Sequence, residues 1–278
     1  MPHASHLLQK RIRTLTIVAA VAIGASGFAA GCGVMKNSAE YLISGNEFFK
    51  VGDYPKAEKD YREALKRSAT PVERATALNN LGVVLNEEGQ YGQAVEVFKE
   101  GLGIDPKNVI ATYAMAQALV NLKRYDEAIE MARKAIEINP DEAGGHRALA
   151  DAAFAKGDYQ TASDEYRYLT QADADDDEAH QNLAKAQAAN GDPEGAMVEN
   201  QKAIEINPDN ALAITQKAEL HLKKGDRAAA LAEVEKALDK DPDLKPAKDL
   251  LSQLQGSSEA SRATGTGAAA SQTTETTN

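Results

Sequence analysis

The sequence lacks several residue types that many folds and binding sites require. It has no tryptophan, a single cysteine (Cys32) and only 5% aromatic residues. One cysteine excludes an internal disulfide and any zinc or iron–sulfur site that is built on several thiolates. The shortage of aromatic side chains also disfavours a β-sandwich, because its strands are rich in aromatic and branched residues.

Basic residues are also scarce. The chain has 31 Lys and Arg against 42 Asp and Glu, which gives a formal net charge of −11. Three of the basic residues lie in the first 31 positions, so the remainder carries 28 basic and 42 acidic residues, or −14. A surface of this sign repels phosphate backbones and excludes nucleic-acid binding through a basic footprint.

The common motifs of catalytic and metal sites are absent as well. The chain contains no Gly-Lys-Ser/Thr phosphate loop, no Gly-x-Ser-x-Gly elbow and no His-Glu-x-x-His. His146 and His180 stand 34 residues apart, without the three or four ligands that zinc requires. The acidic run 173–178 fails as a calcium loop, because Glu178 and Ala184 stand where that loop needs Gly and Glu. We therefore predict no enzymatic activity, no cofactor and no metal.

The N-terminus has the parts of a secretion signal. Lys10, Arg11 and Arg13 precede an apolar stretch over 15–30, and a signal peptide combines such a basic segment with a short apolar core. These sixteen residues are short for a transmembrane helix, which needs about 20 residues. We predict a signal peptide over residues 1–31.

Small residues precede Cys32 in the sequence Ala29-Ala30-Gly31-Cys32, which resembles the lipobox of bacterial lipoproteins. The resemblance implies cleavage before Cys32, lipid on its thiol and new amine, and a short linker over 32–37. Gly33 in place of Asp implies the outer membrane, facing the periplasm. Ala29 stands where the family usually has Leu or Val, so ordinary signal cleavage and an uncleaved anchor remain alternatives.

Most of the remaining chain consists of one repeated pattern. The spacing is 34 residues, apart from one step of 37, whose extra residues we place in a turn over 68–74. The six segments are 38–71, 75–108, 109–142, 143–176, 177–210 and 211–244. Position 20, counted from the start of each segment, is always alanine: Ala57, Ala94, Ala128, Ala162, Ala196 and Ala230.

Each segment predicts two helices that pack closely through small residues. Position 8 is also small in every copy: Gly45, Gly82, Ala116, Ala150, Ala184 and Ala218. A Gly-Asp or Gly-Gln step follows in five copies and predicts a left-handed turn between the helices. Four copies carry a Pro at position 32, which ends the second helix. Neither helix can bury its apolar face alone, so neighbouring pairs must stack.

These columns resemble those of the tetratricopeptide repeat (TPR) family over residues 38–244. The resemblance implies an all-α fold, a right-handed α-solenoid of six helix pairs. A further helix over 245–255, which carries Leu250, Leu251 and Leu254, would cap the last pair. Residues 256–278 are rich in Gly, Ser, Ala and Thr, and we predict that they are disordered.

In TPR proteins the first helix of each pair lines a concave face, which implies a groove for a peptide or protein partner. The matching positions here supply the candidate groove residues Asn46, Phe49, Asn79, Asn80, Asn86, Tyr113, Gln117, Asn121, Arg147, Asp151 and Gln181. Amides offer adaptable hydrogen bonds and an exposed Tyr113 would offer rigid contact area. The alternative interpretation is that these are simply solvated polar positions.

The resemblance therefore implies a lipid-anchored scaffold of the bacterial cell envelope. TPR lipoproteins of this size include pilotins and pilus-assembly factors, so assistance in assembling a pilus or secretion system is the first hypothesis. An adaptor for cell-wall hydrolases or proteases is the alternative. A periplasmic metal-binding or catalytic protein would need a site that the sequence does not show. The identity of the partner and the oligomeric state stay open.

Overall fold

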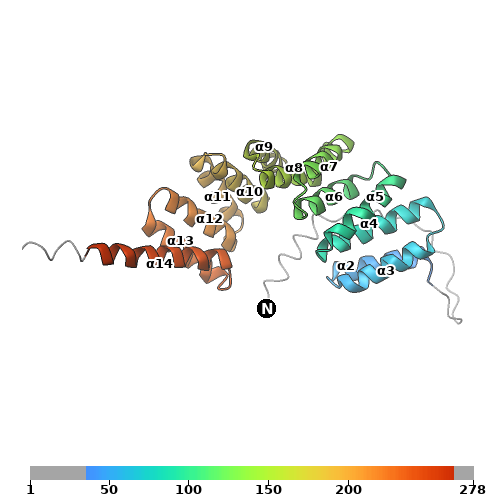
Figure 1. Ribbon diagram of the computed structural model, residues 1–278, viewed down its shortest axis with the longest axis horizontal. Helices are drawn as coiled ribbons and strands as arrows, with labels where there is room; N and C mark the ends of the chain where they lie inside the picture. Colours follow the sequence, from blue (N-terminus) through green and yellow to red (C-terminus); the bar gives the residue numbers. More distant parts are fainter. Residues whose placement is uncertain (1–35, 266–278) are drawn as a thin grey trace, which may run out of the picture. The chain divides into compact units, whose positions relative to one another are not determined.

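The structure, a computed structural model, describes residues 36–265, and side chains as far as Gly256. Its described part contains thirteen helices and no strand. They are α2 (Ser38–Lys50), α3 (Tyr54–Arg67), α4 (Pro71–Glu87), α5 (Tyr91–Ile104), α6 (Val109–Asn121), α7 (Tyr125–Ile138), α8 (Ala143–Lys156), α9 (Tyr159–Ala172), α10 (Asp177–Ala189), α11 (Pro193–Ile206), α12 (Ala211–Lys223), α13 (Arg227–Lys240) and α14 (Lys245–Gly265) (Figure 1). The all-α solenoid predicted from the sequence is confirmed. Cys32 and the predicted signal peptide lie outside the described residues.

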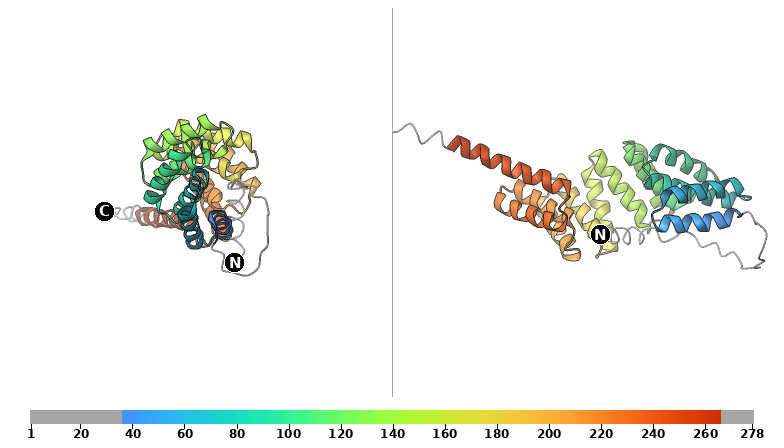
Figure 2. Two further views of the ribbon diagram at one scale, coloured as in Figure 1. Left: turned by 90° about the vertical axis from the view of Figure 1, so that its right-hand side faces the viewer. Right: turned by 90° about the horizontal axis from the view of Figure 1, so that it is seen from below.

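The chain divides into two compact units between Lys156 and Gly157. The N-terminal unit contains α2 to α8, and the C-terminal unit contains α9 to α14. Helices α2 to α13 correspond to the two helices of each of the six repeats, and those of the fourth repeat, α8 and α9, belong to different units. We call the first helix of a repeat helix A and the second helix B. In each unit successive helices lie against one another as short antiparallel rods (Figure 2). Among the described helices, none combines the length and apolar character required to span a bilayer.

Glycines at the turns between helix A and helix B adopt left-handed backbone angles. Their φ values lie between 74° and 93° at Gly52, Gly89, Gly157, Gly191 and Gly225. The third pair has Lys123 at this position, and its φ is 60°. The left-handed conformation is sterically unfavourable for a lysine, and Lys123 adopts it nevertheless. The packing of the two helices therefore imposes the geometry of this turn without a glycine.

Within each unit, the small residues predicted at positions 8 and 20 lie where helix A and helix B of a pair meet. All six alanines at position 20 are fully buried. At Gly82 of α4, an added Cβ atom would lie 2.5 Å from the ring of Phe98 in α5, and at Gly45 it would lie 2.6 Å from the ring of Tyr61. Absence of a side chain at these two positions therefore lets a buried aromatic ring rest on the backbone of helix A.

Helix α4 begins earlier than the sequence predicts. We placed the three extra residues of the second repeat in a turn over 68–74, but α4 already starts at Pro71. Thr70 caps it through a capping box with Glu73, and Pro71 occupies the first turn, where its missing N–H is harmless. The insertion therefore lengthens helix A of the second pair by one turn.

Helix α14 also differs from its prediction. The sequence predicts a capping helix over 245–255 and a disordered tail from 256, but the helix continues to Gly265. Ala247, Leu250 and Leu254 are buried against α12 and α13, as a cap requires. The extension contains Gly, Ser and Thr beside its Glu, Ala and Arg, so helix propensity alone does not explain why the helix continues.

Candidate functional site

The face formed by α2, α4, α6 and α8 in the N-terminal unit carries most of the candidate groove residues, and we call it the amide face. Its N-terminal part is a hydrogen-bonded cluster. The hydroxyl of Tyr61 donates to Asn46 Oδ1 over 2.7 Å, and Asn80 Nδ2 donates to the same oxygen over 3.1 Å. Tyr61 is 2% exposed, and burial, followed by the nearby Asp60, raises the pKa of its hydroxyl. Asn46 and Asn80 thus tie the first two pairs together.

Two further asparagines of α4 have buried oxygen atoms that accept no hydrogen bond. The Oδ1 atoms of Asn79 and Asn86 are buried and have no partner among the described residues. Asn86 Nδ2 donates to the carbonyl of Ala114 in α6 over 2.8 Å, which orients its amide. A buried acceptor without a donor costs about 1–3 kcal/mol, so an N–H or O–H donor would be favourable here once the groups that cover these oxygens move aside.

Tyr113 of α6 is placed differently from the exposed anchor that the sequence predicts. An added Cβ atom at Gly144 of α8 would lie 2.6 Å from the Tyr113 ring, so the ring packs directly on the backbone of the next helix A. It also borders two apolar clusters of the N-terminal unit. Burial, with a smaller contribution from Glu142, raises the pKa of Tyr113 to about 12. The ring therefore supports the packing of α6 on α8.

The other candidates of the N-terminal unit differ in exposure. Asn121 is exposed and donates from Nδ2 to the carbonyl of Gln117 over 2.9 Å, while Gln117 itself is partly exposed. Phe49 is partly buried, and its ring centroid lies 5.6 Å from that of Tyr54. Arg147 and Asp151 lie on α8, where both are partly buried and both have partners. They add one charge of each sign to an otherwise neutral face.

Gln181 belongs to the C-terminal unit and is engaged in a polar cluster there. Its side chain is 6% exposed, and its Oε1 accepts from Asn210 Nδ2 over 3.0 Å. Asn210 also donates to Asp177, which accepts a second bond from Asn207 over 2.8 Å. This cluster connects the turn before α12 to α10, so Gln181 stabilises the packing of these two elements.

The histidines of α8 and α10 fasten each helix A to the preceding turn. His146 Nε2 lies 2.9 Å from the carbonyl oxygen of Pro140, and His180 Nε2 lies 3.2 Å from that of Ala174. His180 Nδ1 lies 2.7 Å from a carboxylate oxygen of Glu199. Burial acts to raise the pKa of Glu199, but hydrogen bonds from Lys202 and His180 outweigh it and hold that pKa below its ordinary value.

The described residues contain no group of three or more His, Cys, Asp or Glu side chains that could hold a metal ion.

A carboxylate recurs at position 23 of the repeat, which lies in helix B, and the sequence analysis does not single it out. Glu233 lines a pocket of about 310 Å³ in the C-terminal unit, beside Lys217, Lys236 and Lys240. Its carboxylate pairs with Lys217 at 3.2 Å and with Lys236 at 3.1 Å. The lysines are thus already neutralised by the protein's own acids.

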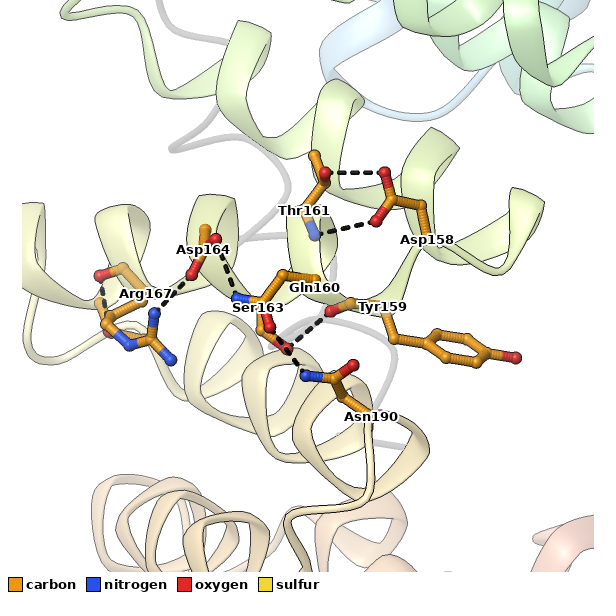
Figure 3. A network of polar contacts seen from close by, with 9 residues as sticks. Asp158, Tyr159, Gln160, Thr161, Ser163, Asp164, Arg167 and Asn190 are labelled. Carbon is orange, nitrogen blue, oxygen red and sulfur yellow. Dashed lines mark hydrogen bonds and ion pairs between the residues drawn. The ribbon is translucent and has the colours of Figure 1, made fainter.

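A chain of polar contacts joins α9 to α10 (Figure 3). Asn190 donates to Gln160 over 3.0 Å, Gln160 donates to Asp164 over 3.0 Å, and Arg167 pairs with Asp164 at 2.7 Å. These side chains lie in solvent, where such contacts contribute about 0–1 kcal/mol each. They belong to the surface of the C-terminal unit and leave the amide face as the candidate binding site.

The fold defines a helical-repeat protein in which most candidate groove residues lie on the first helices of the N-terminal pairs. Two family models, both described as tetratricopeptide repeat, match the chain. One covers residues 85–152 and 188–254, and the other covers 44–109 and 147–211. The chain therefore belongs to the tetratricopeptide repeat family.

Curated relatives match only part of the repeat array. Photosystem I assembly protein Ycf3 of Synechococcus sp. (strain CC9902) is 31% identical over 72 residues, which is 26% of this chain and 42% of that protein. This chain thus spans less than half the length of that relative. The match extends over about two repeats and says nothing about the remainder of either protein.

Solved structures share the fold at low sequence identity. Cut9, in its complex with Hcn1, matches 78% of this chain over 43% of its own length, with a TM-score of 0.68 and 16% identity. The pilF protein of Pseudomonas aeruginosa matches 78% of this chain over 97% of its own, with a TM-score of 0.64 and 17% identity. YrrB, a TPR protein with an unusual peptide-binding site, has a TM-score of 0.53 at 21% identity and covers 68% and 96% of the two chains.

Proposed function

We propose that this protein is a non-enzymatic scaffold that binds a peptide or protein partner on its amide face. The observation that carries the proposal is the pair of buried Oδ1 atoms of Asn79 and Asn86, which accept no hydrogen bond from the described residues. Val83 lies between them on α4 and adds apolar surface one turn from each. A bound peptide that displaces the groups covering these oxygens would supply the missing donors from its backbone N–H groups.

Assembly of a pilus or secretion system is the role that we propose for this scaffold. The likeness in fold to pilF of Pseudomonas aeruginosa, over 78% of this chain, supports it. A curated relative with similar repeats also bears the name of an assembly protein. Such a role requires a surface that holds a partner without chemical change, and the amide face has the neutral hydrogen-bonding groups for that purpose.

The scaffold would act from the surface of a membrane. The Gly31-Cys32 sequence after an apolar stretch supports cleavage and lipidation at Cys32, and Gly33 supports the outer membrane, with the repeats in the periplasm. The described repeats begin at Ser38, so only a short segment would separate the anchor from α2. Tethering confines the amide face to the membrane and raises its effective concentration for any partner there.

Replacement of Cys32 by Ser tests the tethered scaffold. We expect Cys32→Ser to remove the protein from the membrane fraction, because no thiol remains to receive lipid, and to abolish the lipid mass on the N-terminal peptide. The soluble variant should still capture the same envelope partner once purified, since the amide face is unchanged. A Met35→Ser variant keeps Cys32 and serves as the matched control. Unchanged membrane association of Cys32→Ser would contradict the anchor, and loss of capture by the folded variant would contradict an independent binding face.

A further inference from the structure

Asp60 of α3 is a buried acid that the fold does not neutralise. Its side chain is 9% exposed, and its Oδ2 atom is buried without a hydrogen-bond partner among the described residues. A buried carboxylate is tolerated when a cation pairs with it, and it is destabilising when no cation does. The N-terminal unit therefore keeps a negative charge in a position where a partner's cation would be strongly favoured.

Acids at the equivalent repeat position of the C-terminal unit have the basic partner that Asp60 lacks. Glu199 and Glu233 occupy the same repeat position as Asp60, position 23. Each is paired by a side chain from helix A of its own pair, His180 at 2.7 Å and Lys217 at 3.2 Å. The corresponding residues of α2 are Tyr41 and Ser44, which carry no cation. The first helix pair therefore offers Asp60 no basic side chain at the positions that partner Glu199 and Glu233.

Asp60 lies at the edge where a preceding helix would pack. In the last pair, Lys217 donates to Gln201 of the preceding helix B over 3.0 Å and also pairs with Glu233. Among the described residues no helix precedes α2, so none of them covers this edge of the first pair as α11 covers the last one. We call the surface formed by Tyr41 and Phe48 of α2 with Asp60 the first-pair edge.

The first-pair edge already attracts cations. The guanidinium carbon of Arg67 lies 4.8 Å from the centroid of the Tyr41 ring, and Lys36 Nζ lies 5.5 Å from the same centroid. Lys56 Nζ lies 5.3 Å from the centroid of the Phe48 ring. Tyr41 stands at the repeat position of His180, which contacts the acid equivalent to Asp60, so an aromatic ring that binds cations belongs to the same edge as a carboxylate that lacks one. The edge therefore matches a partner segment that is both apolar and basic.

We propose that the first-pair edge docks a helix of another protein that places a Lys or Arg on Asp60. The helix would take the place of a preceding helix B, and its cation would stand where Lys217 stands in the last pair. A second copy of this chain fits poorly. Its last helix B has Glu235 at the position where Gln201 contacts the next pair, and α14 packs against α12 and α13.

Neutralising Asp60 separates this proposal from a purely structural role. We expect Asp60→Asn to raise the melting temperature of the full chain by about 2–4 °C, because it removes a charge without a partner. Glu233→Gln is the matched control and should lower the melting temperature by a similar amount, because its two lysines then lose their acid. A fall in melting temperature for Asp60→Asn would show that the protein itself neutralises Asp60, and would overturn the proposal.

Crosslinking from the edge tests the partner. With p-benzoylphenylalanine at position 41 of the full chain in cells, we expect a crosslink to a basic helical segment of a different protein. Asp60→Asn should reduce its yield by about tenfold or more, whereas Glu47→Gln, an exposed acid of the same pair, should leave it unchanged. A crosslink to residues 1–35 of the same chain, to a second copy or to lipid would overturn the proposal, and so would no crosslink. This test is independent of the amide face, so either surface can fail alone.

Discussion

Phe98→Ala lowers the free energy of unfolding by about 3–5 kcal/mol, the largest loss that we expect from a single substitution. Phe98 is fully buried in the main apolar cluster of the N-terminal unit. Its ring rests on the backbone at Gly82, so truncation leaves a cavity that the two helices cannot close without moving apart. Urea titration followed by circular dichroism measures the loss, and Lys99→Ala on the exposed side of α5 should change it by less than about 0.5 kcal/mol.

A double substitution checks the cause of that loss. Gly82→Ala alone should be destabilising, because its Cβ atom would lie 2.5 Å from the Phe98 ring. In the Phe98→Ala background the same methyl group enters the cavity, so its cost should disappear and the two changes should not add. Strict additivity of the two losses would contradict the close packing of the ring on Gly82.

Tyr113→Ala should be the second most damaging change, with a loss of about 2–3 kcal/mol. The ring fills the space above Gly144, where α8 presents backbone in place of a side chain. Tyr113→Phe keeps the ring and should stay within about 1 kcal/mol of the wild type. The measurement is the same urea titration. A Tyr113→Ala variant of unchanged stability would restore Tyr113 as an exposed contact residue and contradict its packing role.

The helix pairs could be predicted because their signals are local and repeat. Small residues at two positions, a glycine at the turn and a proline at the end fix two helices without knowledge of any partner. The start of α4 escaped prediction because the step of 37 residues was assigned to a turn. The capping signal Thr70-Pro71-Val72-Glu73, which begins this helix, could have placed it correctly.

The positions of the amide-face residues on the helices could be predicted from the sequence, but their exposure could not. The asparagines of α2 and α4 do lie on neighbouring helices, because the repeat brings the first helices of successive pairs together. Burial of Tyr113 depends on Gly144 in the following repeat, so no pattern within its own helix shows it. The missing partner of Asp60 could have been inferred, since the sequence alone shows Glu at the same position of the last three repeats and His or Lys on the first helix of each of them.

Crosslinking from Val83 of the full chain tests the amide face most directly. With p-benzoylphenylalanine at this position in the native envelope, we predict one crosslinked partner, with the crosslink confined to a single peptide segment. Asn79→Ala should reduce its yield by about tenfold while the protein stays folded, and the same probe at Lys99, which is exposed on α5, should give no crosslink to this partner. Equal crosslinking from both positions, or a yield that does not respond to Asn79→Ala, would contradict a binding site on the amide face.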